Sequence, residues 1–115
     1  MKNIVILDDN EDIGVLLKEY IEVCGEDVQV QSFSSHHSFL ENYNFSLDLD
    51  ILFLDFHINT KVPEDLFKEL NNKSHTIKKI YIMSGDHDVV IDNAEYDVDY
   101  LPKPFDFSKI PYIFS

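Results

Sequence analysis

The feature that most constrains the fold is the segment from Asp50 to His57, which reads DILFLDFH. Its run of apolar residues, ILFL, has no polar alternation, which is typical of a strand covered on both faces in a parallel α/β sheet. Ligands of such sheets bind beyond the carboxyl ends of the strands, where the strand order reverses. The segment therefore predicts a central strand that delivers one carboxylate, Asp55, to the ligand-binding edge.

Other strand-like runs also end in polar residues of complementary kinds. Residues 4–7 lead into Asp8 and Asp9, residues 80–83 lead into Ser84, and residues 98–101 lead into Pro102-Lys103-Pro104. Because the carboxyl ends of parallel strands meet at one edge of a sheet, we expect these groups to lie together. The predicted edge carries several carboxylates, a hydroxyl group and an ammonium group.

The segments between these runs predict helices, with a further strand at residues 27–33. The apolar residues expected to face inward from the first three helices are Ile13, Leu16, Leu17, Tyr20, Ile21 and Cys24, then Phe39, Leu40 and Tyr43, then Leu66, Phe67 and Leu70. Gly25 is expected to end the first helix, Ser34 or Ser35 to cap the second, and Pro63 to begin the third. A fourth helix over residues 86–96 has a poor apolar stripe, and a last helix starts at Asp106 or Ser108.

Length and charge narrow the possible functions. A chain of 115 residues is expected to form one domain, and its net charge of −13 argues against direct binding to nucleic acid or to anionic membranes. All its positively charged residues are Lys. Because it contains neither an apolar run long enough to span a bilayer nor a signal peptide, we expect a cytoplasmic protein. The single Cys24 is interpreted as a buried small hydrophobic residue.

On these residues the whole chain resembles the receiver domain of two-component response regulators. In that family an acidic pair follows the first strand, a phosphoryl-accepting Asp ends the third, a Ser or Thr ends the fourth, and Lys-Pro follows the fifth. The corresponding residues here are Asp8 and Asp9, Asp55, Ser84, and Lys103-Pro104.

The resemblance implies a single receiver domain over residues 1–115. Its fold is α/β, a doubly wound parallel sheet of five strands in the order 2-1-3-4-5 with five helices. The fourth helix is expected to be short or irregular, and the fifth truncated.

The resemblance also implies a function. A histidine kinase or histidine phosphotransfer protein transfers a phosphoryl group to Asp55, and the transfer switches binding to an unknown downstream protein. The chain is then a signalling phosphoacceptor that assists its own phosphorylation and dephosphorylation, rather than an enzyme. Ser84 and Lys103 would contact the phosphoryl oxygens.

Magnesium is the expected cofactor. Two adjacent carboxylates 4 Å apart repel each other by about 4 kcal/mol at an effective dielectric constant near 20, so the cluster favours a divalent cation. Hard oxygen ligands and a phosphoryl substrate indicate Mg²⁺. The family pattern makes Asp8, Asp9, Asp55 and the backbone carbonyl of His57 its ligands.

Some positions depart from the family or allow two readings. Tyr100 stands where the family carries an aromatic switch residue, and the alternative interpretation is a plain core aromatic. Asn59 and Pro63 replace a customary Pro and Gly, and the segment between Ser84 and Lys103 is shorter than usual.

Two alternative functions remain. One is a receiver-like protein-interaction module that works without phosphorylation. The other, an aspartyl-phosphate hydrolase, is weak because such enzymes carry a second Asp two residues after the nucleophile of the first strand, where this chain has Asn10.

Overall fold

The computed structural model describes residues 2–25, 27–58, 61–72, 77–85 and 96–103. Its strands are β1 (Lys2–Leu7), β2 (Val28–Phe33), β3 (Leu49–Asp55), β4 (Ile77–Ser84) and β5 (Val98–Pro102), and its helices are α1 (Glu11–Cys24), α2 (His36–Asn42) and α3 (Pro63–Asn72). The predicted fourth helix falls almost entirely outside the described residues, and the predicted last helix falls wholly outside them.

The strands form one parallel sheet of five strands in the order β2-β1-β3-β4-β5, which confirms the predicted topology. The register brings the carboxyl ends of neighbouring strands to the same level. Leu7 of β1 pairs with Leu54 of β3, and Asp55 pairs with Met83 of β4. Ser84 then pairs with Pro102 of β5. Residues that follow these strands therefore gather at one edge of the sheet.

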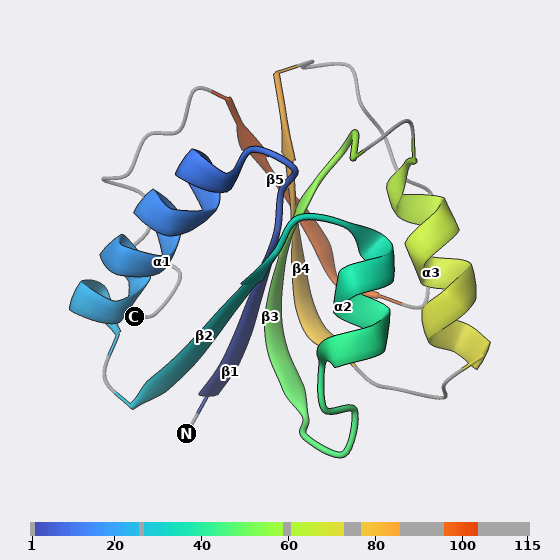
Figure 1. The fold of residues 1–115 in the computed structure, drawn as a ribbon, viewed down its shortest axis with the longest axis horizontal. Coiled ribbons are helices and arrows are strands. Elements are labelled where there is room, and N and C mark those ends of the chain that lie inside the picture. The colour runs from blue at the N-terminus through green and yellow to red at the C-terminus, as the bar shows by residue number, and fades with distance from the viewer. Residues whose placement is uncertain (1, 26, 59–60, 73–76, 86–95, 104–115) are drawn as a thin grey trace.

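The sheet lies between two layers of helices, with α1 on one face and α2 and α3 on the other (Figure 1). Alternate residues of each central strand enter separate cores. On β3, Phe53 packs with the α1 residues Leu17 and Ile21, whereas Leu52 packs in the core that contains Phe39 and Leu66. Burial of both faces is the reason that β3 has no polar alternation.

The inward faces of α2 and α3 largely follow the sequence prediction. Leu66, Phe67, Leu70, Phe39 and Tyr43 are all buried. The helical spacing therefore located the buried sides of these two helices.

Among the described residues, no helix is both long and apolar enough to cross a membrane.

The prediction for the inward side of α1 was wrong at Leu16, and Ile13, Tyr20 and Cys24 are only partly buried. The buried residues of this helix are Gly14, Leu17 and Ile21. Leu16 points out, with 55% of its surface exposed. The buried stripe of a short amphipathic helix is narrow, and Leu16 is rotated by about 100° from Leu17 around the helix axis.

Ser35 caps α2, and this contact supports a prediction. Its hydroxyl oxygen accepts a hydrogen bond of 3.0 Å from the backbone N–H of Ser38. We expect Ser35→Ala to lower the free energy of unfolding by about 1 kcal/mol, because that N–H loses its acceptor. Urea denaturation should detect the change, and Ser34→Ala, at the exposed neighbouring serine, is the matched control. Equal losses in the two variants would contradict the assignment of the cap.

Candidate acidic site at the carboxyl edge of the sheet

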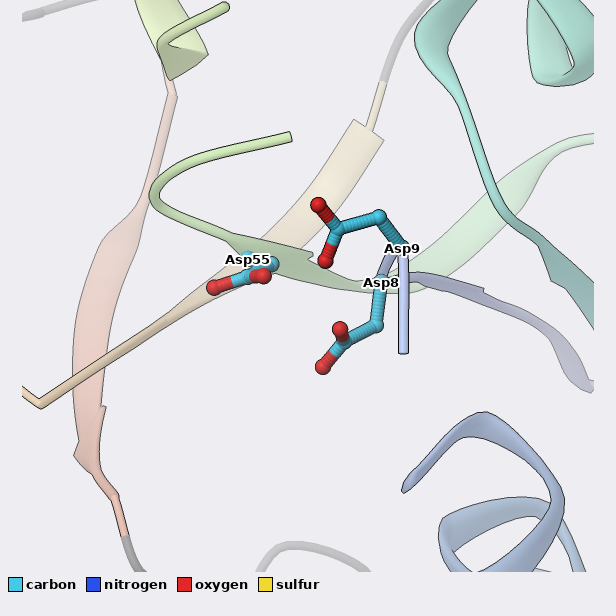
Figure 2. A group of neighbouring side chains, drawn as sticks. All are labelled: Asp8, Asp9 and Asp55. Atoms are coloured by element: carbon cyan, nitrogen blue, oxygen red, sulfur yellow. The ribbon is translucent and has the colours of Figure 1, made fainter. Parts of the chain in front are cut away.

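Three carboxylates converge at the carboxyl edge of the sheet (Figure 2). Asp8 and Asp9 follow β1, and Asp55 is the last residue of β3. One carboxylate oxygen from each of the three lies within 4.8 Å of the others. The adjacency of β1 and β3 in the sheet brings together residues that are more than forty positions apart in the chain.

The three carboxylates differ in burial and in hydrogen bonding. Asp8 is 2% exposed and Asp55 is 8% exposed, whereas Asp9 lies at the surface. One oxygen of Asp8 accepts a hydrogen bond of 2.9 Å from the backbone N–H of Asn10. This hydrogen bond joins the side chain of Asp8 to the backbone two residues later and so forms an Asx turn. The turn fixes the orientation of Asp8.

Lys103 joins the two buried carboxylates. Its Nζ lies 3.2 Å from Oδ2 of Asp8 and 3.1 Å from Oδ1 of Asp55. The backbone N–H of Lys103 donates a hydrogen bond of 2.8 Å to the carbonyl oxygen of Ser84, which holds the residue beyond β5 against the end of β4. The lysine is therefore positioned by its backbone as well as by its charge.

The burial and the charges change the proton affinities of this cluster. Burial and the neighbouring carboxylate of Asp8 raise the pKa of Asp55 from 3.8 to about 6, even though Lys103 opposes the increase and Asp9 adds to it. Burial alone would lower the pKa of Lys103, but the carboxylates of Asp55 and Asp8 outweigh it and raise that pKa above its ordinary value. Asp55 is thus mainly ionised at neutral pH and is paired with a charged lysine.

The other predicted residues occupy different places around this edge. Ser84 is the last residue of β4 and is partly buried, one position beyond the partner of Asp55. The side chain of His57 is exposed. Its ring is nearly perpendicular to the ring of Phe56, and the two ring centroids are 4.5 Å apart. Tyr100 of β5 is 43% exposed. Its ring is therefore outside the core in this structure, and the reading of Tyr100 as a plain core aromatic is wrong.

The sequence reasoning missed the role of Asn10. Its side-chain oxygen accepts hydrogen bonds from the backbone N–H groups of Asp12 and Ile13, so it caps α1. Its own N–H orients Asp8. An Asn immediately before an acidic first turn is the sequence signal that would have identified this cap. Asn10 thus connects the start of α1 to the acidic site.

The donors at this edge suit a divalent cation. In the part of the chain that the structure describes, the three carboxylates face one ammonium group, that of Lys103, so negative charge is in excess there. Carboxylate oxygens are the ligands preferred by hard cations such as Mg²⁺, and a cation between them offsets their mutual repulsion. The residues present therefore fit the predicted metal.

Comparisons with known proteins concern the family and the fold of the chain. The family described as response regulator receiver domain matches residues 4–114. A search of curated proteins gave no match.

Several solved structures have the same fold. A CheY-like receiver domain from Methylobacillus flagellatus is 22% identical, with a TM-score of 0.77 over 98% of this chain and 95% of that one. A receiver domain protein from Bacillus halodurans is 18% identical, with a TM-score of 0.77 over 98% and 93% of the two chains. Response regulator protein TrrA from Thermotoga maritima, in complex with Mg²⁺-BeF, is 23% identical, with a TM-score of 0.75 over 98% and 96%.

The structural likeness concerns the fold, and the family match covers nearly the whole chain. With the sheet order and the convergence of residues at its carboxyl edge, these findings establish that the chain belongs to the family of response regulator receiver domains.

Proposed function

We propose that the chain accepts a phosphoryl group on Asp55 in a Mg²⁺-dependent reaction and thereby switches its binding to a downstream protein. The donor in this proposal is a phosphohistidine of a histidine kinase or a histidine phosphotransfer protein, and the location is the cytoplasm. The observation that carries the proposal is the bridge from Lys103 to Asp8 and Asp55 beside a third carboxylate. Receiver domains are signalling domains, and the proposal gives this one an aspartyl-phosphate switch.

Each residue has a defined part in the transfer. An ionised oxygen of Asp55 attacks phosphorus and forms the new O–P bond, while the P–N bond to the donor histidine breaks and its electron pair returns to the imidazole nitrogen. Lys103, freed from its pair with Asp55, binds one phosphoryl oxygen. The hydroxyl group of Ser84 donates a hydrogen bond to another. These contacts stabilise charge that increases on the phosphoryl oxygens.

The metal would be held by Asp8, Asp9, Asp55 and the backbone carbonyl of His57. When bound, Mg²⁺ supplies positive charge that offsets the carboxylates and the phosphoryl oxygens. Asp8 is suited to this role because Asn10 already fixes its orientation. The relative from Thermotoga maritima was solved with Mg²⁺-BeF, which supports the assignment of Mg²⁺.

The proposed switch uses Ser84 and Tyr100. These residues lie near the ends of the neighbouring strands β4 and β5, where Ser84 pairs with Pro102. Movement of Ser84 toward a phosphoryl group would open space into which the exposed ring of Tyr100 turns. A ligand that contacts only one of two arrangements shifts the population toward it.

Phosphoryl incorporation tests the proposal directly. Incubation with a small phosphodonor and Mg²⁺ is expected to add one phosphoryl group, measured by intact mass spectrometry, and Asp55→Asn is expected to abolish the addition because the nucleophile is lost. Asp48→Asn, an exposed residue just before β3, is the matched control and should be labelled like the parent. Equal labelling of Asp55→Asn and the parent would refute the assignment. Partner binding that is indifferent to both Asp55→Asn and Asp55→Glu would favour the interaction module instead.

Magnesium is expected to stabilise the protein even without a phosphodonor. A cation that binds the folded acidic cluster and not the unfolded chain raises the free energy of unfolding by about 2.7 kcal/mol at one hundred times its dissociation constant. Thermal denaturation across a Mg²⁺ titration measures this increase. The double variant Asp8→Asn/Asp9→Asn should lose it, and an unchanged response in that variant would place the metal elsewhere.

A further inference from the structure

A second group of ionisable residues lines a cavity beside α2 and α3. These two helices lie on the face of the sheet opposite α1 (Figure 1). The cavity volume is about 550 Å³. The titratable and charged residues that line it are His36 and His37 of α2, Lys61 before α3, and Asp65, Lys68 and Glu69 of α3. None of these residues belongs to the acidic site described above.

His36 is the buried member of this group. It is 3% exposed, and its Nε2 has no hydrogen-bond partner among the described residues. Burial lowers the pKa of His36 below its ordinary 6.5, and the positive charge of Lys61 lowers it further, while Asp65 partly opposes them. The imidazole is therefore neutral at neutral pH, and a proton added to it places a charge where water is largely excluded.

The residues that act on His36 also hold the start of α3. The backbone N–H of Val62 donates a hydrogen bond of 2.9 Å to Oδ2 of Asp65, and the N–H of Asp65 donates one of 3.0 Å to the carbonyl oxygen of Val62. The N–H of Lys61 donates a hydrogen bond of 2.9 Å to the carbonyl oxygen of Ile58. We call residues 61–65 the α3 entry.

The α3 entry is connected to the acidic site through the chain itself. Ile58 lies three residues after Asp55, and it is buried in the core that also contains Leu66. The N–H of Phe56 donates a hydrogen bond of 3.0 Å to the carbonyl oxygen of Met83 at the end of β4. Because the N–H of Lys61 is hydrogen-bonded to the carbonyl oxygen of Ile58, loosening of the α3 entry removes a hydrogen bond from a residue three positions after Asp55.

We propose that His36 is an acid-sensitive latch. Its protonation loosens the α3 entry, and this in turn loosens residues 56–58, which directly follow Asp55. Because Nε2 of His36 is buried without a partner among the described residues, a protonated imidazole gains contact with water when the start of α2 moves outward, and it gains a counterion when the carboxylate of Asp65 turns from the N–H of Val62 toward it. Repulsion from Lys61 favours both movements. The proton comes from the solvent, and the inference does not require that Asp55 be phosphorylated.

Hydrogen exchange of single amides tests this latch. The reporters are the hydrogen-bonded N–H groups of Lys61, Val62 and Asp65, followed by NMR from about pH 7 to about pH 5 and corrected for the intrinsic pH dependence of exchange. Their protection is expected to fall severalfold relative to the amides of β3. Because a single proton binds to His36, the protection can fall by at most about tenfold per pH unit.

Variants of the two histidines distinguish the effect of protonating His36 from loosening that other groups cause at acidic pH. His36→Gln cannot be protonated, so its reporters should keep their protection relative to β3. His37→Gln changes the exposed neighbour on the same helix and should behave like the parent. An equal fall in His36→Gln, or no fall in the parent, would overturn the proposal.

A second measurement does not depend on the folding of His36→Gln. Since Lys61 lowers and Asp65 raises the proton affinity of His36, Lys61→Gln should move its NMR titration midpoint to higher pH and Asp65→Asn to lower pH. In Lys61→Gln the loosening of the reporters should begin at correspondingly higher pH. A loosening that does not follow the midpoint would show that another group controls the α3 entry.

Discussion

Replacing Lys103 with Met is expected to lower the free energy of unfolding by about 2 to 3 kcal/mol at neutral pH in the absence of metal. The variant leaves two carboxylates facing each other without a cation, and the side chain of Asp8 is fully buried while that of Asp55 is 11% exposed. Asp55 then takes up a proton more readily, which limits the loss. Urea denaturation near neutral pH measures the effect.

The same variant should be rescued in two ways. Acidification protonates Asp55, whose pKa is raised to about 6, so one of the facing charges is lost and the deficit should shrink at acidic pH. Adding Asp55→Asn to the variant removes one of the facing charges, and most of the lost stability should return. A deficit that persists in both cases would mean that lost packing of the lysine stem, and not charge, causes it.

Lys79 offers a matched control for Lys103. Its Nζ also contacts two carboxylates, Asp97 at 3.0 Å and Asp99 at 2.8 Å, but both carboxylates are more than 60% exposed. Lys79→Met is therefore expected to cost less than about 1 kcal/mol, because water already solvates the acids. A cost as large as that of Lys103→Met would show that burial is not the deciding factor.

Asp55→Asn is expected to stabilise the metal-free protein by about 1 to 2 kcal/mol at neutral pH. The variant removes the cost of a buried charge and its repulsion from Asp8 and Asp9, while Lys103 keeps its pair with Asp8. A pKa increase of about two units corresponds to roughly 3 kcal/mol, and the expected gain is smaller because water reaches this edge of the sheet.

The pH dependence of this gain follows from proton linkage. The pKa of Asp55 is about 6 in the folded protein, raised from its ordinary value of 3.8. The folded state therefore binds this proton more tightly than the unfolded chain, and its stabilising effect is fully present below pH 3.8 and lost as the pH rises through about 6. The advantage of Asp55→Asn should be largest above pH 6 and shrink toward pH 4. Denaturation of both proteins across this range measures it, and an advantage independent of pH would contradict the charge repulsion.

The candidate site shows what local sequence patterns can and cannot predict. Four residues at the ends of predicted strands, Asp8, Asp9, Asp55 and Lys103, do lie together, because parallel strands in this order share a carboxyl edge. The sequence did not reveal that one lysine bridges both buried carboxylates. That bridge depends on the length of β5 and on the hydrogen bond from the Lys103 N–H to Ser84.

The errors on α1 have a related origin. Helical spacing shows that one side of the helix is apolar, but the exact buried stripe depends on the rotation of the helix over β1 and β2. Gly14 lies so close to Ser32 of β2 that a side chain there would meet its hydroxyl oxygen at 2.6 Å. Gly14 therefore lies on the same buried side of α1 as Leu17 and Ile21, whereas Leu16 lies at the surface.

By itself, the sequence determined the class of fold, the order of the elements and the strand ends at which reactive groups occur, because periodicity and uninterrupted apolar runs are local consequences of backbone geometry. Only the tertiary structure decided which carboxylates are buried, how Lys103 joins them, that Tyr100 points outward and that the buried Nε2 of His36 has no hydrogen-bond partner among the described residues. Burial of polar groups and electrostatic pairing depend on neighbours distant in the chain, whereas a local pattern shows only which side of an element is apolar.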